Sequence, residues 1–193
     1  APQLPHTSLA DNVTKLHNVM GTLEGPVLLV GHSYGGQVIT AGGNMPDVVG
    51  LVYVAAFALD EGESIGALLE GAPPSPAIAH LAVDELGFAW LPQEDFVNHF
   101  AADVDPVEAN IMYAVQQPLA LSALADVIES PAWANLPTWY VIATNDEAIP
   151  PPAQHLFAER MGATVLEVDS GHVAMWSRSD EVADFILSAA ATL

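Results

Sequence analysis

Between Val27 and Gly36 the sequence reads VLLVGHSYGG, and this segment sets the architecture of the chain around it. Val27 to Val30 is a run of apolar strand formers, which is typical of a strand buried on both faces of a parallel sheet. Gly31 to Gly35 has the pattern Gly-x-Ser-x-Gly, and a helix is expected to follow through Gly43. A strand, a sharp turn at a serine and a helix form a nucleophile elbow, which predicts a nucleophilic Ser33. We expect Gly31 and Gly35 to be glycines because side chains there would collide with the neighbouring strand and helix.

Strands and helices alternate on both sides of this segment. Three more apolar runs predict strands, at Leu51 to Phe57, Thr138 to Thr144 and Thr164 to Val168. Apolar residues at helical spacing predict helices at Ser8 to Met20, Pro152 to Arg160 and Asp180 to Ala191. This alternation predicts an α/β fold with a mainly parallel sheet, flanked by helices and joined by right-handed crossovers.

One long segment interrupts the alternation. Pro73-Pro74-Ser75-Pro76 cannot lie in regular structure, and Asp105 to Glu108 reads as the capped start of a helix. We therefore expect a single domain over residues 1–193. Its core would comprise residues 1–59 and 136–193, and a helical cap of approximately residues 60–135 would be inserted between them.

The residues that follow each predicted strand are the candidates for chemistry, because ligands bind beyond the carboxyl ends of parallel strands. Asp146 follows the third strand and His172 follows the fourth. A serine nucleophile needs a base, and the base needs an orienting carboxylate. We predict His172 as the base, Asp146 as the acid and the Tyr34 N–H as an oxyanion donor. Asp60, after the second strand, is the alternative to Asp146.

The order Ser33, Asp146, His172 is that of α/β-hydrolases. Four segments resemble the small serine esterases similar to plant methylesterases and hydroxynitrile lyases: VLLVGHSYGG (27–36), LVYVAAF (51–57), TNDEAIPP (144–151) and DSGHVAMWSRSDEVADFI (169–186). The resemblance implies an α/β-hydrolase fold and hydrolysis of small carboxylic esters by a Ser33-His172-Asp146 triad through an acyl-enzyme. It implies no cofactor and no metal. The lyases of this group carry Lys directly after the catalytic His, whereas this sequence has Val173, which favours ester hydrolysis.

Members of this family normally begin with a strand that ends in His-Gly, whose loop supplies a second oxyanion-hole donor. No such segment precedes Ser8 in this sequence, so we expect these N-terminal strands to be absent from the chain. We therefore expect a second chain, as in a homodimer, or a separate N-terminal segment to complete the sheet beside the Ser33 strand and supply that donor.

Two other functions stay open at this point. A lyase could use the same three residues, and a non-catalytic binding protein could share the frame, because a fold does not fix a function. A fluorophosphonate label on Ser33 would separate the binding protein from the two enzymes. Cyanohydrin cleavage, compared with hydrolysis of p-nitrophenyl esters, would separate the two enzymes.

Large apolar side chains in the cap and after His172 predict an apolar substrate pocket. We expect Trp90 and Met112 from the cap, and Met175 and Trp176 from the loop of the base, to line it. Such a pocket suits a small ester. Strongly anionic substrates are disfavoured, since only Arg160 and Arg178 could oppose their charge.

The charge of the chain is strongly negative, with 24 Asp and Glu against 3 Lys and Arg and a net charge of −21. This excludes nucleic acid and disfavours anionic membrane surfaces as partners, because both need clustered cations. The surplus acid indicates either a solvated acidic surface or a halophilic adaptation to high salt. The chain has no cysteine, no membrane-length apolar run and no signal peptide at its visible start, so we expect a cytoplasmic protein.

Overall fold

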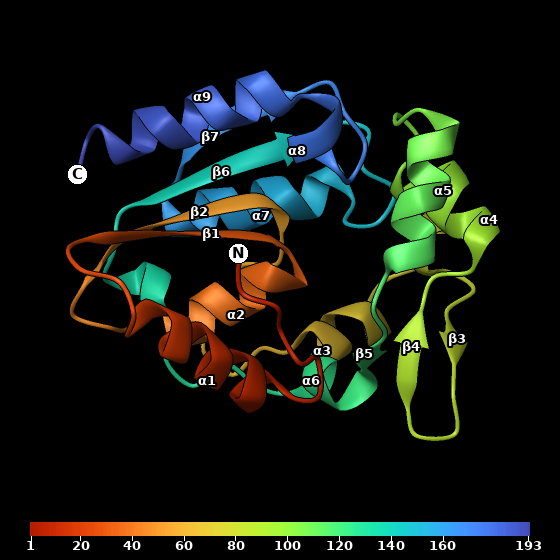
Figure 1. The fold of residues 1–193 in the computed structure, drawn as a ribbon, viewed down its shortest axis with the longest axis horizontal. Helices are drawn as coiled ribbons and strands as arrows, with labels where there is room; N and C mark the ends of the chain where they lie inside the picture. Colours follow the sequence, from red (N-terminus) through yellow and green to blue (C-terminus); the bar gives the residue numbers. More distant parts are fainter.

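The computed structural model describes all 193 residues and is built around a four-stranded parallel sheet (Figure 1). The strands lie in the order β1-β2-β6-β7. Their bounds are β1 Val27–Ser33, β2 Val48–Ala56, β6 Thr138–Ala143 and β7 Thr164–Val168. All three neighbouring pairs are parallel, so the carboxyl ends of all four strands meet at one edge of the sheet.

Helices cover both faces of this sheet. Three helices, α1 (Leu9–Met20), α2 (Tyr34–Gly42) and α7 (Pro151–Met161), share one apolar core with inward-facing residues of β2 and β6. Two helices, α8 (Ala174–Ser177) and α9 (Ser179–Ala190), share a second core with the opposite face. Along β2 the side chains alternate, so that Leu51 and Tyr53 enter the first core while Val52 and Val54 enter the second.

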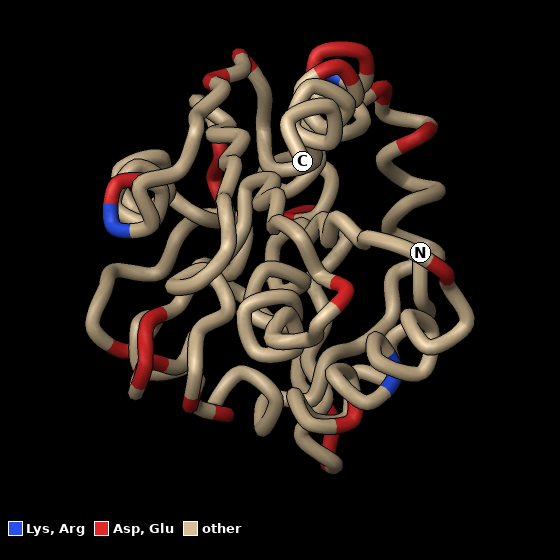
Figure 2. Tube along the Cα trace, turned by 90° about the vertical axis from the view of Figure 1, so that its left-hand side faces the viewer, with Lys and Arg blue, Asp and Glu red and all other residues tan.

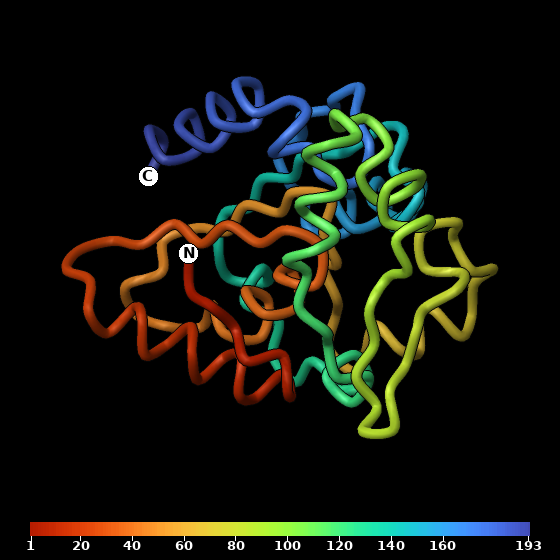
Figure 3. The backbone as a smooth tube through the Cα atoms, turned by 45° about the vertical axis from the view of Figure 1, so that its right-hand side comes forward, coloured from red at the N-terminus to blue at the C-terminus, as the bar shows by residue number.

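Most of the segment between β2 and β6 lies at the carboxyl edge of the sheet, on the right in Figures 1 and 3, and its last part leads back to the start of β6. It contains short helices, and also a three-stranded antiparallel sheet in the order β3-β4-β5 that the sequence did not predict. Its elements are α3 Ile65–Glu70, η1 Pro76–Ile78, β3 Ala82–Val83, β4 Phe88–Trp90, α4 Gln93–Asp95, the π-helix η2 Phe96–Phe100, α5 Pro106–Val115, β5 Leu119–Ala120, α6 Leu121–Ala125 and η3 Ala132–Ala134. Strands of two or three residues are too short to show an alternating pattern.

The predicted strands and helices of the sheet are confirmed, with two differences at the Ser33 strand. β1 runs to Ser33 rather than ending at Val30, so the serine itself belongs to the strand. β1 is also less buried than the apolar run suggested, and Val30 is 44% exposed. The reason is that β1 lies at an edge of the sheet and pairs only with β2.

The N-terminal residues pack beside the segment between β2 and β6, which we call the cap segment (Figure 3). The backbone N–H of Ala120 donates to the carbonyl oxygen of His6, and the backbone N–H of Leu9 donates to Asp126 Oδ2. Ser8 caps α1, since its Oγ accepts from the Asp11 N–H at 3.0 Å. His17 Nε2 lies 2.8 Å from the Gly42 carbonyl oxygen, and this contact joins α1 to α2.

Figure 2 shows the acidic residues scattered around the trace and the three cationic residues far apart from one another. Arg160 pairs with Glu63, and Arg178 lies near Asp169 and Glu181. None of the helices combines the length and the apolar character that crossing a membrane requires.

Candidate active site

The turn from β1 into α2 holds Ser33 in a strained backbone conformation. Its φ is 53° and its ψ is −123°, a region that residues other than glycine rarely adopt. The close packing of this turn depends on glycine at two positions. A Cβ on Gly31 would lie 2.6 Å from the Gly35 carbonyl oxygen, and one on Gly36 would collide with the Phe57 carbonyl oxygen. A Cβ on Gly35 would meet open space, so the expectation for Gly35 was wrong and Gly36 is the glycine that the packing requires.

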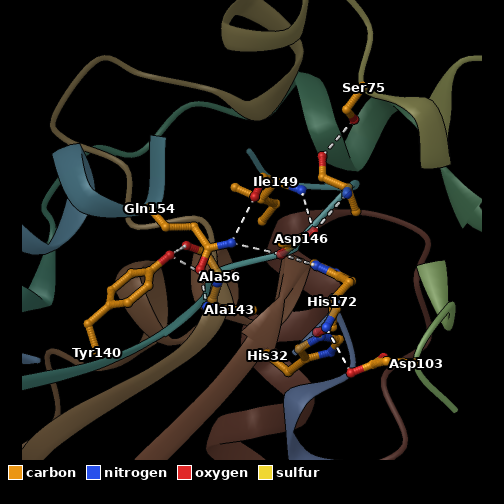
Figure 4. A network of polar contacts seen from close by, with 12 residues as sticks. His32, Ala56, Ser75, Asp103, Tyr140, Ala143, Asp146, Ile149, Gln154 and His172 are labelled. Carbon is orange, nitrogen blue, oxygen red and sulfur yellow. Dashed lines mark hydrogen bonds and ion pairs between the residues drawn. The ribbon is translucent and has the colours of Figure 1, made fainter. Parts of the chain in front are cut away.

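Asp146 and His172 form a buried pair beyond β6 and β7 (Figure 4). Asp146 Oδ2 lies 2.7 Å from His172 Nδ1, and both side chains are 0% exposed. Asp146 Oδ1 accepts from the backbone N–H groups of Ala148 and Ile149 at 2.7 and 2.9 Å. Gln154 Nε2 also donates to Oδ2, so four groups hold the carboxylate: these two N–H groups, the Gln154 amide and His172 Nδ1. The carboxylate can therefore fix both the orientation and the tautomer of the imidazole.

Gln154 is a member of this cluster that the sequence reasoning missed. It lies on α7, is 0% exposed, and donates from Nε2 to Asp146 Oδ2 at 2.8 Å and to the Ile149 carbonyl oxygen at 2.7 Å. Its Oε1 accepts from the Ala143 N–H at 3.1 Å. The signal in the sequence was a polar residue on the same helix face as Phe157 and Ala158, because a buried amide needs partners.

Two rings enclose His172. His32 and Phe100 each lie with their ring centroid 4.6 Å from that of His172. His32 Nε2 is 2.9 Å from the main-chain oxygen of His172, which makes it the donor to that carbonyl. His32 lines the same cavity as Ser33. Burial, and next the neighbouring His172, lower the pKa of His32 to about 3.

His172 Nε2, the ring nitrogen opposite the Asp146 contact, is buried and has no hydrogen-bond partner, so Ser33 Oγ does not hydrogen-bond to it. His172 itself does not line the cavity, but its neighbours His32 and Phe100 line it together with Ser33. A buried nitrogen without a hydrogen-bond partner lowers the stability of the fold, so its presence calls for an explanation such as a role in catalysis. Beside the cavity that Ser33 lines, such a nitrogen can accept a proton. In enzymes without bound substrate, contacts between nucleophile and base are often long and tighten only in the complex.

A cavity of about 530 Å³ opens in front of Ser33, between the sheet edge and the cap segment. Of its 25 lining residues, 19 are hydrophobic and none is Asp, Glu, Lys or Arg. Trp90, Met112 and Met175 line it, as do Tyr34 and, next to the buried pair, Ile149. An apolar cavity with few polar groups beside a strained serine is the usual form of a small-molecule site.

Trp176 lies outside this lining. Because α8 begins at Ala174, successive side chains point in different directions, and Met175 enters the cavity while Trp176 is 51% exposed. The Trp176 indole N–H donates to Glu108 Oε2 at 2.8 Å.

Other carboxylates that follow strands are engaged elsewhere, among them Asp169, whose Oδ1 accepts from Asn145 Nδ2 at 2.6 Å. Asp60 Oδ1 accepts from the Glu61 N–H, and Glu147 Oε2 lies 2.5 Å from His99 Nδ1 in the cap segment. Among the carboxylates considered, Asp146 is thus the one that contacts His172.

Tyr34 is the first residue of α2, so its N–H lies at a helix N-terminus, where negative charge is favoured. Its hydroxyl accepts from Asn12 Nδ2 at 2.6 Å, and burial raises the pKa of this hydroxyl to about 12. This anchor ties the residue after Ser33 to α1. The structure contains no group of three or more His, Cys, Asp or Glu side chains arranged to hold a metal ion.

Comparison with known proteins gives three kinds of match. The sequence profile of the Alpha/beta hydrolase family matches residues 1–185. The protein named "Alpha/beta hydrolase nvfD" of Aspergillus novofumigatus (strain IBT 16806) is 26% identical over 176 residues, which cover 85% of this chain and 70% of that protein. The "Carbendazim hydrolyzing esterase" of Nocardioides sp. (strain SG-4G) is 43% identical over 67 residues, 32% of this chain and 28% of that protein. The crystal structure of polyneuridine aldehyde esterase superposes with a TM-score of 0.81 at 18% identity, covering 95% of this chain and 80% of that one.

Proposed function

Because the chain belongs to the alpha/beta hydrolase family, we propose that it is a serine hydrolase that cleaves small, uncharged carboxylic esters. The family and the fold that the sequence resembled are confirmed by the match over residues 1–185 and by the superposition. The observation that carries the proposal is the buried Asp146–His172 pair, with its unpartnered Nε2, beside a cavity lined by a strained serine.

The reaction would proceed in two halves. His172 Nε2 takes the proton of Ser33 Oγ as that oxygen attacks the ester carbonyl, and Asp146 stabilises the imidazolium that forms. The Tyr34 N–H donates to the developing oxyanion. The C–O bond of the ester then breaks, the alcohol leaves with the proton from His172, and an acyl-Ser33 remains. Water, deprotonated by His172, attacks this acyl group, releases the carboxylic acid and restores Ser33.

The lining of the cavity supports an apolar and uncharged substrate. No cation lies there to neutralise a carboxylate or phosphate, and burial of an unpaired charge is expensive. A volume of about 530 Å³ lies within the range of sites for small molecules. The names of the two similar proteins, an alpha/beta hydrolase and an esterase, support the same reaction class.

Labelling and substitution of Ser33 test the proposal together. A fluorophosphonate should label one residue, Ser33, in the wild-type chain, and Ser33→Ala should take no label. Ser33→Ala should also lower kcat on p-nitrophenyl butyrate by about 10⁴-fold or more without lowering thermal stability. A wild type that takes no label and turns over no ester or cyanohydrin would favour a binding protein, and cyanohydrin cleavage in place of ester hydrolysis would favour a lyase.

A further inference from the structure

We propose that Asp103, in the cap segment, is a positioning residue for His172 and acts through the backbone of Gly171. The proposal rests on ester hydrolysis with His172 as the base. Asp103 contributes nothing to the cavity lining, and its role would be to fix the loop that carries the base.

The contact is direct and joins two parts of the chain that are far apart in sequence. The Gly171 N–H donates to Asp103 Oδ2 at 2.8 Å, across 68 residues of chain (Figure 4). On the other side of the same loop, His32 donates to the main-chain oxygen of His172. The backbone of the base is therefore held from the cap on one side and from the nucleophile strand on the other.

Asp103 lies on a turn that is anchored on both sides. Ala101 and Val104 are buried at 0% and 8% exposure and belong to the apolar cluster of the cap. The Val104 N–H donates to the Ala101 carbonyl oxygen at 3.1 Å, which closes the turn around Asp103. Val173, the residue after the base, packs into the same cluster. A change in the position of this turn would therefore be passed to the loop of His172.

Glycine at position 171 permits the close approach. The three heavy atoms nearest to a Cβ there all belong to Asp103, with Oδ1 at 2.8 Å, Cγ at 3.3 Å and Oδ2 at 3.8 Å. The backbone of Gly171 lies outside the left-handed region, so an alanine at this position adds no backbone strain, and the group nearest to its Cβ is the carboxylate. Gly171→Ala therefore displaces the Asp103 side chain, whose carboxylate holds the nearest atoms.

A second contact between the cap and the loop of the base provides a matched control. Glu108 accepts from the Trp176 indole N–H at 2.8 Å, four residues beyond His172. Glu108→Ala removes a hydrogen bond between the same two segments, but it leaves the backbone beside the base untouched.

The experiment compares kcat and KM on p-nitrophenyl butyrate, with urea unfolding of each variant as the record of stability. Asp103→Ala should lower kcat about tenfold and change KM less than about twofold, because only the reacting geometry is disturbed. Asp103→Asn keeps an acceptor oxygen and should restore kcat to within about twofold of the wild type. Glu108→Ala should leave both constants within about twofold.

A double-mutant cycle removes the dependence on any one variant. Gly171→Ala should lower kcat in the wild-type background and have no further effect in the Asp103→Ala background, since the atoms it would strike are gone. The proposal is overturned if Asp103→Ala behaves like Glu108→Ala, if Asp103→Asn loses as much kcat as Asp103→Ala, or if the effects of Gly171→Ala and Asp103→Ala add. An inactive wild type with unlabelled Ser33 would instead overturn the proposed function.

Discussion

His32 Nε2 lies 2.9 Å from the main-chain oxygen of His172, so the residue before the nucleophile holds the residue proposed as the base. This donor role requires a proton on Nε2, which one tautomer of the neutral ring provides. The low pKa of His32, about 3, keeps the ring neutral over the whole range in which an esterase would work.

The low pKa of His32 predicts that acid weakens the fold. In the unfolded chain this imidazole binds a proton below about pH 6.5, whereas in the folded chain it binds one only below about pH 3. Between these values the unfolded state holds more protons, so the free energy of unfolding falls as the pH falls. Each pH unit in this window removes up to about 1.4 kcal/mol.

His32→Gln isolates this contribution, because glutamine keeps an N–H donor and does not titrate. Urea unfolding at pH 7.5 and 5.0 should show a loss of stability that is larger in the wild type than in His32→Gln, by up to about 2 kcal/mol. Equal losses in the two proteins would mean that His32 titrates normally in the folded state.

Gln154 should support both stability and activity. Gln154→Leu removes a donor from Asp146 and leaves the Ala143 N–H without its partner, so the free energy of unfolding should fall by about 1–3 kcal/mol. The loosened carboxylate should also lower kcat by about tenfold.

Gln37 provides the control for this substitution, since it is also 0% exposed but bonds to the Asp126 carbonyl oxygen, away from Asp146. Gln37→Leu should lower stability and spare kcat. If both variants lose stability and neither loses kcat, Gln154 has only a structural role.

The sequence predicted the sheet and its helices because their side chains face a core, and a core imposes a period. The strand at Thr164 to Val168 has the predicted bounds, and the Asp146–His172 contact brings together two residues that were selected by their places after strands. Parallel topology is what makes this possible, since it gathers the carboxyl ends of the strands at one edge.

The internal structure of the cap and the supporting contacts of the site could not be predicted from the sequence, because they depend on individual long-range hydrogen bonds. The contact from Gly171 to Asp103 and that from Gln154 to Asp146 have no periodic signature, and the strands β3 and β5 are two residues each. The side chains of Met175 and Trp176 point in different directions because they lie on a four-residue helix that the sequence pattern did not predict.

The surplus of acid predicts that salt stabilises the fold. With 24 acidic and 3 basic residues, the folded chain concentrates negative charge, and self-repulsion destabilises it. KCl shortens the screening length from about 30 Å at 0.01 M to about 3 Å at 1 M, so Tm should rise over this interval by several degrees. A further rise between 1 and 3 M would support adaptation to high salt. At pH 4, near the pKa of free carboxyls at about 4, the effect should shrink. A Tm that does not change with KCl at pH 7.5 would exclude both destabilising self-repulsion and adaptation to high salt.

The cavity lining predicts strong discrimination against anionic esters. A suitable pair is p-nitrophenyl pentanoate and mono-p-nitrophenyl glutarate, which share a five-carbon acyl chain and differ in a terminal methyl or carboxylate. No Lys or Arg lines the cavity and the net charge is −21, so the carboxylate would be both desolvated and repelled. We expect kcat/KM to be about 100-fold lower for the glutarate, a difference of about 2.7 kcal/mol in transition-state binding.

The matching terminal amide, p-nitrophenyl glutaramate, separates the effect of charge from that of polarity, and its kcat/KM should fall between those of the other two esters. In 1 M KCl the long-range repulsion is screened while the desolvation cost stays, so the discrimination should narrow without disappearing. Equal rates on the pentanoate and the glutarate at low salt would show that the reacting ester does not enter this cavity.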